Sequence, residues 1–383
     1  MKTSHRLLCC LFSLWVIGAF TSCQTPSPQI DISQAKFYQS AAGAYLYALD
    51  ANTGKEIWKF KAQVSASAPV VSDNLAFFTD ESNLLYAVNA KTGVGEYSKY
   101  LHAQVTGPLQ IDGEQLYYLT KNAQLHCRSK GTGKEQWVSQ LAKVPFNFGI
   151  GKKRIYIPFD YTHLQALDKQ NGTQIWKHHL AQPLLGTPTE VEHLILVSTE
   201  SSTIAAYDTV SKKIAWSRKI QKPSPTSPIL HSSGAYWGLA SGKITGFDPT
   251  NGQEFWSYQL KRPVLSNPLI HNDVIYYGAN DKRLYAQSLK TKEILWTFQS
   301  KYWVMTTPRF YQGKIYFTDG GGSVYCVDIT AKKLLWQYRT NGTLDLMRSF
   351  VIKNGMVYFG GDASPKVMAP NNTLEDMREF YSQ

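Results

Sequence analysis

The side chains that most often carry out chemistry are spread along this chain without forming a known catalytic or metal-binding motif. The nine His residues show no HxxxH or HExxH spacing, which would place two imidazoles on one helix face as zinc ligands. His178 and His179 are adjacent, so on a strand they point to opposite faces. The sequence has no Gly-x-Ser-x-Gly elbow and no Walker motif. We therefore expect no enzyme activity, no catalytic residue, no bound metal and no cofactor.

One residue, Cys23, stands in a context for covalent modification. Positive charges near the N-terminus precede an apolar run over residues 7–20, which is too short to cross a bilayer but suits a signal peptide. The run leads into Ala-Phe-Thr-Ser-Cys at residues 19–23, which is similar to the bacterial lipobox, where the Cys becomes the lipidated N-terminus. Cleavage nearby as a plain signal peptide is the alternative.

The lipobox divides the N-terminal region. Residues 1–22 are predicted to be a signal peptide of the lipoprotein type. Residues 23–34 are predicted to be the lipidated Cys and a flexible tether, because they are rich in Pro, Ser and Gln. Gln24, where an Asp would retain the protein at the inner membrane of enteric bacteria, indicates the outer membrane. We expect an acyl chain such as palmitate at Cys23 and a domain that faces the periplasm.

The rest of the chain carries an aromatic residue every 39 or 40 residues. A constant period of this length is typical of repeat architectures. Ten residues before each aromatic the side chain is small, and in two units it is Cys127 or Cys326, which we interpret as buried packing residues. The eight aromatic marks are Trp58, Tyr97, Trp137, Trp176, Trp216, Trp256, Trp296 and Trp336.

Each unit fits four short β-strands and shows no helical periodicity. The first unit, for example, has an apolar run at 46–49, a tight Asp-x-x-Thr-Gly turn at 50–54 and a strand that carries Trp58. Aromatic residues make up 13% of the chain and charged residues 18%, which suits packed sheets and excludes a long acidic tail. We predict an all-β fold: one eight-bladed β-propeller of four-stranded antiparallel blades over residues 35–383.

The eighth blade is predicted to be shared between the two ends of the chain. Residues 346–360 would supply its inner strands and residues 44–60 its outer strands. Both Lys36–Ser40 and Val357–Gly360 align with its second strand, so the sequence leaves open which terminus provides that strand. Closure of the ring by both termini would protect the sheet edges.

The segment Tyr47–Trp58, with the sequence YALDANTGKEIW, resembles the tryptophan-docking motif of PQQ-like repeat propellers. Weaker copies cover nearly the whole chain after the signal peptide. The resemblance implies that the eight aromatic marks are structural docking residues, packed between neighbouring blades, and not catalytic ones.

Two branches of these propellers imply different functions. Quinoprotein dehydrogenases hold PQQ and calcium, contain a disulfide between adjacent Cys residues and are longer through insertions between blades. Here the units are uniform, and no adjacent Cys pair remains after the signal peptide. The BamB-like outer-membrane lipoproteins of the β-barrel assembly machinery have a lipobox, a short tether and one eight-bladed propeller. This chain is similar to the second layout from end to end.

The charges follow the repeat as well, in a chain with a formal net charge of +12. Lys recurs in the turn after the third strand of most units, and acidic residues recur in the turn after the second strand, which lies on the opposite face. Ordinary solubilising turn residues explain this pattern, and weak attraction to anionic lipid headgroups is the alternative. Nucleic acid is not an expected partner of an exported protein.

Apolar residues that fall outside the repeat register mark the candidate partner surface. They lie in the connections between units, on the face with the acidic turns, where gathered apolar side chains usually mark an interaction site unless they turn inward. In BamB-like proteins, connections of this type contact the barrel-forming partner. Leu184 and Leu185 stand in a similar place, although Gly186 follows where that family has Arg. The predicted partner-binding residues are Phe146, Phe148, Leu184, Leu185, Trp303, Leu344, Leu346 and Met347.

These features predict a noncatalytic, lipid-anchored scaffold of the bacterial cell envelope that binds a protein partner in outer-membrane β-barrel assembly. Two alternatives stay open. One is a propeller that binds PQQ or another small ligand, and the other is a general interaction protein of the envelope.

Overall fold

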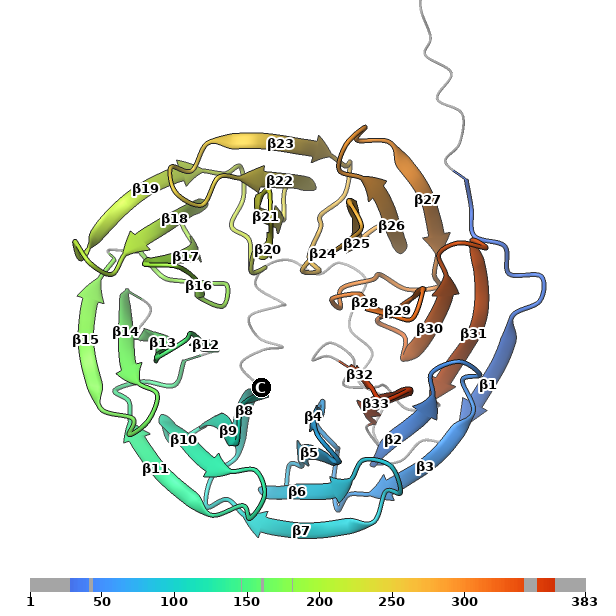
Figure 1. Cartoon of the computed structure of the whole chain (residues 1–383), viewed down its shortest axis with the longest axis horizontal. Helices are drawn as coiled ribbons and strands as arrows, with labels where there is room; N and C mark the ends of the chain where they lie inside the picture. Colours follow the sequence, from blue (N-terminus) through green and yellow to red (C-terminus); the bar gives the residue numbers. More distant parts are fainter. Residues whose placement is uncertain are drawn as a thin grey trace, which may run out of the picture.

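The computed structural model describes residues 28–40, 44–145, 147–159, 162–180, 182–340 and 350–361. These residues form a ring of eight β-sheets around a central axis (Figure 1). Seven sheets follow one another along the chain, and the eighth is built from its two ends. The predicted all-β, eight-bladed propeller is confirmed.

The seven continuous blades each run from an inner strand at the channel to an outer strand at the rim (Figure 1). The first blade contains β4 (Val70–Ser72), β5 (Leu75–Thr79), β6 (Leu84–Asn89) and β7 (Gly95–Tyr100), and the second contains β8 (Val105–Asp112), β9 (Gln115–Thr120), β10 (Gln124–Ser129) and β11 (Glu135–Gln140). The third contains β12 (Gly149–Ile150), β13 (Arg154–Phe159), β14 (His163–Asp168) and β15 (Gln174–His179). The fourth contains β16 (Thr189–Val191), β17 (Leu194–Thr199), β18 (Thr203–Asp208) and β19 (Lys213–Lys219).

The next three blades repeat this order. They are β20 (Ile229–His231), β21 (Gly234–Gly238), β22 (Lys243–Phe247) and β23 (Glu254–Gln259); β24 (Leu269–His271), β25 (Val274–Ala279), β26 (Arg283–Ser288) and β27 (Ile294–Gln299); and β28 (Arg309–Tyr311), β29 (Lys314–Thr318), β30 (Ser323–Asp328) and β31 (Lys333–Thr340).

The closing blade joins the two termini in the strand order β3-β2-β33-β32. The C-terminal part supplies the inner strands β32 (Val351–Lys353) and β33 (Met356–Gly360), and the N-terminal part supplies β2 (Tyr45–Asp50) and β3 (Glu56–Lys61). The open question about the second strand is thereby answered: β33 pairs antiparallel with β2. The other candidate, β1 (Lys36–Ser40), instead adds a fifth strand, parallel to β31, at the rim of the preceding blade.

The middle strands are buried on both faces because each blade packs between two others. All six residues of β17 are buried, whereas the outer strand β11 alternates between exposed and partly buried positions. Sheets covered on both faces favour continuous apolar runs of this kind, and sheets with one free face favour alternation. The core is therefore a series of clusters between blades and has no single centre.

In most blades a side-chain cap fixes the turn before the outer strand. In the closing blade the Asp50 carboxylate accepts hydrogen bonds from the backbone N–H groups of Asn52 and Thr53, at 3.0 and 2.7 Å. Gly54 then takes a φ of +72°, a conformation that costs little only for glycine. The Asp-x-x-Thr-Gly signature is thus explained by the turn it forms.

The aromatic marks pack across the junctions between blades. The Trp58 indole N–H donates to the carbonyl of Ala90 in the next blade, at 3.1 Å, and the Trp336 N–H donates to Ala51 in the closing blade, at 2.9 Å. Tyr97 makes the corresponding bond through its hydroxyl, to Lys130, at 2.7 Å. Each of these aromatic rings also lies against the turn glycine of the following blade; for Trp336 that glycine is Gly54.

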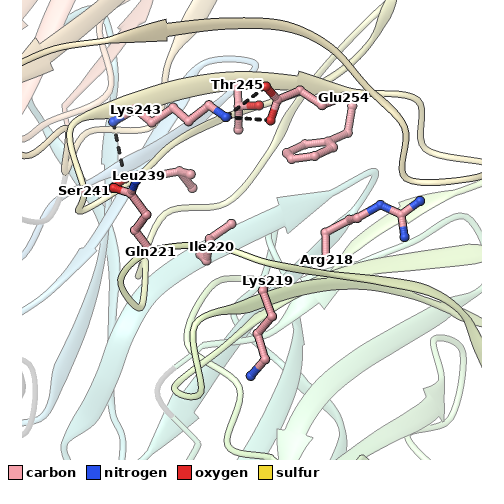
Figure 2. Close-up of a pocket in the computed structure, with 10 residues that line it drawn as sticks. Arg218, Lys219, Ile220, Gln221, Leu239, Ser241, Lys243, Thr245 and Glu254 are labelled. Carbon is pink, nitrogen blue, oxygen red and sulfur yellow. Dashed lines mark hydrogen bonds and ion pairs between the residues drawn. The ribbon is translucent and has the colours of Figure 1, made fainter.

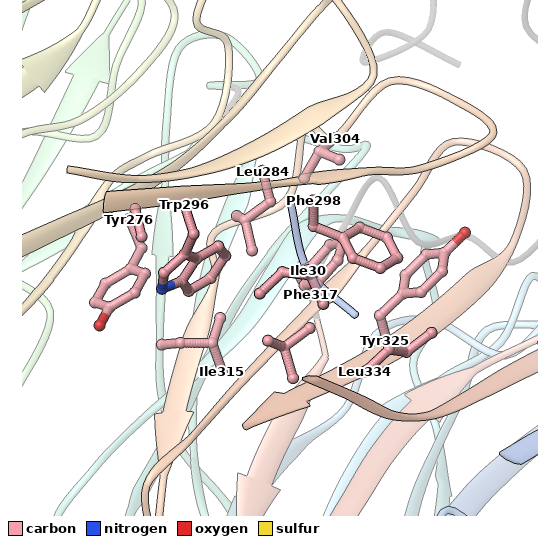
Figure 3. Close-up of a cluster of buried hydrophobic side chains, with 12 residues drawn as sticks. Ile30, Tyr276, Leu284, Trp296, Phe298, Val304, Ile315, Phe317, Tyr325 and Leu334 are labelled. Atoms are coloured by element: carbon pink, nitrogen blue, oxygen red, sulfur yellow. The ribbon is translucent and has the colours of Figure 1, made fainter. Parts of the chain in front are cut away.

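The segment Pro28–Ser40, which we call the N-terminal strap, runs along the rim of the last two continuous blades. Ile30 is 7% exposed and packs among Phe298, Phe317 and Leu334 (Figure 3). Burial of a side chain of this size stabilises by about 1.5–3 kcal/mol. The expected tether over 23–34 is therefore corrected over residues 28–34, which are bound to the propeller because Ile30 is buried there.

Both cysteines among the described residues, Cys127 and Cys326, are free and buried. Burial raises the pKa of the Cys127 thiol to about 11 and that of the Cys326 thiol to about 12. Since the thiolate is the reactive form, we expect the native chain, expressed from residue 24, to react with no aromatic disulfide reagent at pH 8. In urea both thiols should react. Rapid reaction of a thiol in the native protein would contradict this packing.

Within the described ranges, no helix has the length and apolar character needed to cross a membrane.

Candidate functional site

The two faces of the ring have different chemistry. The turns between first and second strands and between third and fourth strands lie on one face, which we call the lysine face. Here Lys130 pairs with Asp73 at 2.6 Å and with Glu114 at 3.0 Å, and Lys290 pairs with Asp273 at 2.9 Å. The hydrogen bond from Lys130 holds the pKa of Asp73 below its usual value. Acids on this same face thus offset part of its positive charge, which weakens the expected polarity between faces.

The opposite face, which we call the connection face, carries the turns between second and third strands and the links from blade to blade. Two of its acidic residues, Asp80 and Asp319, are buried, whereas Glu81 is exposed and Glu200 and Asp281 are partly exposed. Asp319 is buried and accepts bonds from the N–H groups of Gly321 and Ser323 and from the Tyr325 hydroxyl, at 3.0, 3.1 and 2.7 Å. Burial raises the pKa of the Asp319 carboxyl. Asp80 has the same role in the first continuous blade, where it bonds Ser82, Leu84 and Tyr86. These carboxylates cap turns and are not available to a partner.

The links from blade to blade on the connection face alternate between buried and partly exposed residues. In four consecutive blades, the residue four before the repeated Pro is buried and the residue three before it is partly exposed. Leu184 and Val264, for example, turn inward, and Leu185 and Leu265 turn outward. The alternation follows from an extended backbone, in which successive side chains point to opposite sides.

A series of hydrogen bonds holds these links in place. The residue two before the Pro bonds the end of the second strand: Ser266 Oγ accepts from the N–H of Gly278 at 2.8 Å. The residue just before the Pro bonds the neighbouring link. Thr187 N–H donates to Ser227 Oγ, and Ser227 N–H donates to Asn267 Oδ1, each at 2.8 Å. Because this ladder joins three blades, the links form a firm surface and not a set of independent loops.

The outward positions of these links form an apolar arc over four consecutive blades, from β16–β19 to β28–β31. All of its members are partly exposed. Apolar side chains held rigidly beside one another, with polar neighbours around them, are the usual centre of a protein-binding surface. We call the set the connection arc, and its residues are Leu185, Pro225, Leu265 and Met305.

The structure separates the sequence-predicted partner residues into three groups. Three of them are buried: Leu184 is 4% exposed, Phe148 0% and Trp303 8%. The expectation that these three side chains lie on the surface is therefore wrong, because they pack in the interior. The reason for Leu184 is its inward position in the alternation, which places it against Tyr156 and Val197. Leu185 is partly exposed on the connection face. The remaining predictions lie outside the described residues: Cys23, Phe146, Leu344, Leu346 and Met347.

Sequence reasoning missed Pro225 and Met305 as members of one surface with Leu185. A signal was present, because all of them stand three residues before a repeated Pro. The register of the link, and hence which of two adjacent apolar residues faces out, required the structure.

A small pocket opens beside the fourth and fifth continuous blades, lined by residues of β19, β22 and the start of β23 (Figure 2). Its volume is about 190 Å³, below the roughly 300–1,000 Å³ typical of ligand pockets. Lys243 is paired with both Glu254 oxygens, at 2.8 and 2.7 Å. The Arg218 guanidinium donates to the carbonyl of Gly252 at 3.0 Å. The charged side chains of the pocket are therefore already paired within a blade or bonded to the neighbouring blade.

Among the residues that the structure describes, no group of three or more His, Cys, Asp or Glu side chains could hold a metal ion.

Comparison with known proteins places the ring in a family. A family model described as outer membrane protein assembly factor BamB matches residues 42–151, 129–270 and 263–369. The chain belongs to the BamB family. One relative in this family, the outer membrane protein assembly factor BamB of Moranella endobia (strain PCIT), is 22% identical over 203 residues, which are 45% of this chain and 52% of the relative. The alignment thus spans about half the length of that relative.

Two solved structures share the fold of this BamB-family chain. BamB from Moraxella catarrhalis superposes with a TM-score of 0.58 at 16% identity, over 87% of this chain and 98% of its own. The computationally designed Ika8 protein superposes with a TM-score of 0.69 at 15% identity, over 79% of this chain and 95% of its own. At these identities the likeness concerns the fold alone.

Proposed function

We propose that this chain is a noncatalytic scaffold of the bacterial outer membrane, anchored by lipid at Cys23, which binds a protein of the β-barrel assembly machinery through the connection arc. The propeller would face the periplasm, and the anchor would keep it beside the membrane in which barrels are assembled. Anionic headgroups would contribute weak further attraction through exposed lysines.

The observation that supports this proposal most is the combination of family and surface. The family model carries the name of an outer-membrane assembly factor. The connection arc adds four outward residues in consecutive blades, and the Thr187–Ser227–Asn267 ladder joins the links that carry three of them, Leu185, Pro225 and Leu265. An apolar surface on firmly held links suits a protein partner better than a small ligand or a charged substrate.

Affinity purification from native membranes tests the proposal. We expect the unaltered chain to retain a barrel-assembly subunit, and we expect Leu185→Arg and Met305→Arg to reduce its recovery by about tenfold or more, because a charge in the centre of an interface costs at least as much as losing a hot-spot residue. Val210→Arg is the matched control: Val210 is 76% exposed in the same blade as Leu185 but on the lysine face.

Two results would refute the proposal. One is the absence of any barrel-assembly subunit from the eluate of the unaltered chain, and the other is equal recovery by the arc variants and the control. Leu184 is unsuitable for this test, because its burial means that its substitution would lower stability as well as any binding. Lipidation is tested separately, by acyl-chain labelling of the chain and of Cys23→Ser.

A further inference from the structure

The N-terminal strap is attached to the rim by a continuous set of contacts. The backbone of Ile30 donates to the Thr297 carbonyl at 3.1 Å, and the Thr297 N–H donates to the Pro28 carbonyl at 2.9 Å. One blade further, Asp31 N–H donates to the Lys332 carbonyl at 3.0 Å and Leu334 N–H donates to the Asp31 carbonyl at 2.8 Å. The strap thus bonds the outer strands of two blades before it becomes β1.

Two features show that these contacts are specific. Ile30 is inserted into the cluster between the two blades, beneath Phe298 (Figure 3), whereas Ile32, two residues later, is 54% exposed. The strap then pairs in parallel with β31 over five consecutive residue pairs, from Lys36 with Trp336 to Ser40 with Thr340. The path of the chain across the rim is therefore fixed from Pro28 onward.

This path limits where a lipid anchor at Cys23 can be. Cys23 precedes Pro28 by five residues, and an extended chain spans at most about 3.3–3.6 Å per residue, so the anchor lies within about 18 Å of the rim at β27. A compact domain of this length has a radius of gyration of about 20 Å. The strap leaves the ring beside β27 and β31, across the ring from β11 and β15 (Figure 1). An anchor this short cannot bring the membrane to that opposite side.

The surface beside the strap is compatible with lipid headgroups. Lys36 in β1 is exposed there, and so is Lys332 at the adjoining edge of the lysine face, where its carbonyl accepts the Asp31 N–H. Such side chains are attracted to anionic lipid. Ile32 is exposed at the point where the strap crosses between blades. Apolar and basic side chains together are the usual composition of a surface that rests on a bilayer.

From this geometry we propose that the strap fixes the orientation of the propeller on the membrane: the rim at β27, β31 and β1 rests against the lipid surface, and the ring axis runs roughly along the membrane plane. The connection face and the lysine face are then both open to the periplasm. This inference rests on the lipid anchor of the proposed function but is independent of which protein binds the connection arc.

Energy transfer to a fluorescent lipid measures the orientation. The full-length lipoprotein is reconstituted into phosphatidylethanolamine–phosphatidylglycerol vesicles that contain an acceptor-labelled lipid. A donor dye is attached at Gln299→Cys in β27 or, in a second sample, at Val138→Cys in β11, both on exposed positions of outer strands. The buried, unreactive Cys127 and Cys326 do not compete for the dye. We expect about twofold or greater transfer efficiency at 299 than at 138, given the reach of the anchor and the size of the ring.

A matched pair of variants isolates the strap. Ile30→Asp removes the buried contact and should abolish the difference between the two labels, while the protein still floats with the vesicles. Ile175→Asp introduces the same charge at an exposed position of β15, across the ring from the strap (Figure 1), and should leave the difference unchanged. A difference that survives Ile30→Asp, or equal transfer at 299 and 138 in the unaltered protein, would overturn the inference. Failure of Cys23 to carry lipid would instead refute the proposed anchor, and this inference with it, while leaving partner binding to its own test.

Discussion

Trp336→Ala is expected to lower the free energy of unfolding by about 3–5 kcal/mol, the range for truncating a buried aromatic residue. Trp336 is 0% exposed and lies at the junction where the last continuous blade meets the closing blade. Its N–H donates to the Ala51 carbonyl at 2.9 Å, and the Tyr316 hydroxyl donates to the same carbonyl at 3.0 Å. The substitution therefore removes packing and a bond at the place where the ring is closed.

Urea unfolding, followed by the fluorescence of the remaining tryptophans, measures this loss. Trp137→Ala is the matched control, because Trp137 has the same place in its blade but is only partly buried, and its ring N–H has no hydrogen-bond partner among the described residues. We expect Trp137→Ala to lower the free energy of unfolding clearly less than Trp336→Ala does. If both variants lost the same free energy, ring closure at Trp336 would have no special importance for stability.

Gly93→Ala is expected to lower the free energy of unfolding by about 2–5 kcal/mol. Gly93 has a φ of +73°, and an added Cβ would lie 2.6 Å from the Trp58 ring. A left-handed conformation costs an L-residue about 1–2 kcal/mol, and overpacking adds about 1–3 kcal/mol. The two costs can be separated in this chain, because another glycine has the same backbone conformation without the contact.

That glycine is Gly313, with a φ of +75° and no heavy atom within 4 Å of the added Cβ. Gly313→Ala should therefore show the backbone cost alone, about 1–2 kcal/mol, in the same urea measurement. If Gly313→Ala and Gly93→Ala lowered the free energy of unfolding equally, contact with the Trp58 ring would not contribute to the requirement for glycine at position 93.

The regular part of the fold was predictable from the sequence because one physical solution is repeated. The turn with Asp50 and Gly54 and the aromatic that docks on the next blade recur at a constant spacing, so each copy supports the interpretation of the others. The sharing of the closing blade between the two termini could also be predicted, because the first unit lacks its inner strands and the C-terminal segment lacks its outer strands. The sequence could not choose between Lys36–Ser40 and β33 for the second strand, because both have the same pattern and the decision depends on packing against β2.

The candidate site was less predictable because it depends on residues outside the repeat. Leu184 and Leu185 are both apolar, and only the extended course of the link decides that the first packs inward and the second outward. Burial of Ile30 could not be predicted, because it lies in a stretch whose composition is typical of a tether. The gap between blades that its side chain fills is visible only in the structure. The ion pair between Lys130 and Asp73 could likewise not be predicted, because the two residues belong to different blades and meet only in the folded ring.

Site-specific photo-crosslinking in cells tests the central proposal most directly. A photoreactive amino acid replaces Leu185 on the connection face or Val210 on the lysine face of the same blade. The proposed function predicts a crosslink from position 185 to a subunit of the β-barrel assembly machinery and none from position 210. Equal crosslinking at both positions, or a crosslink from 210 alone, would contradict it.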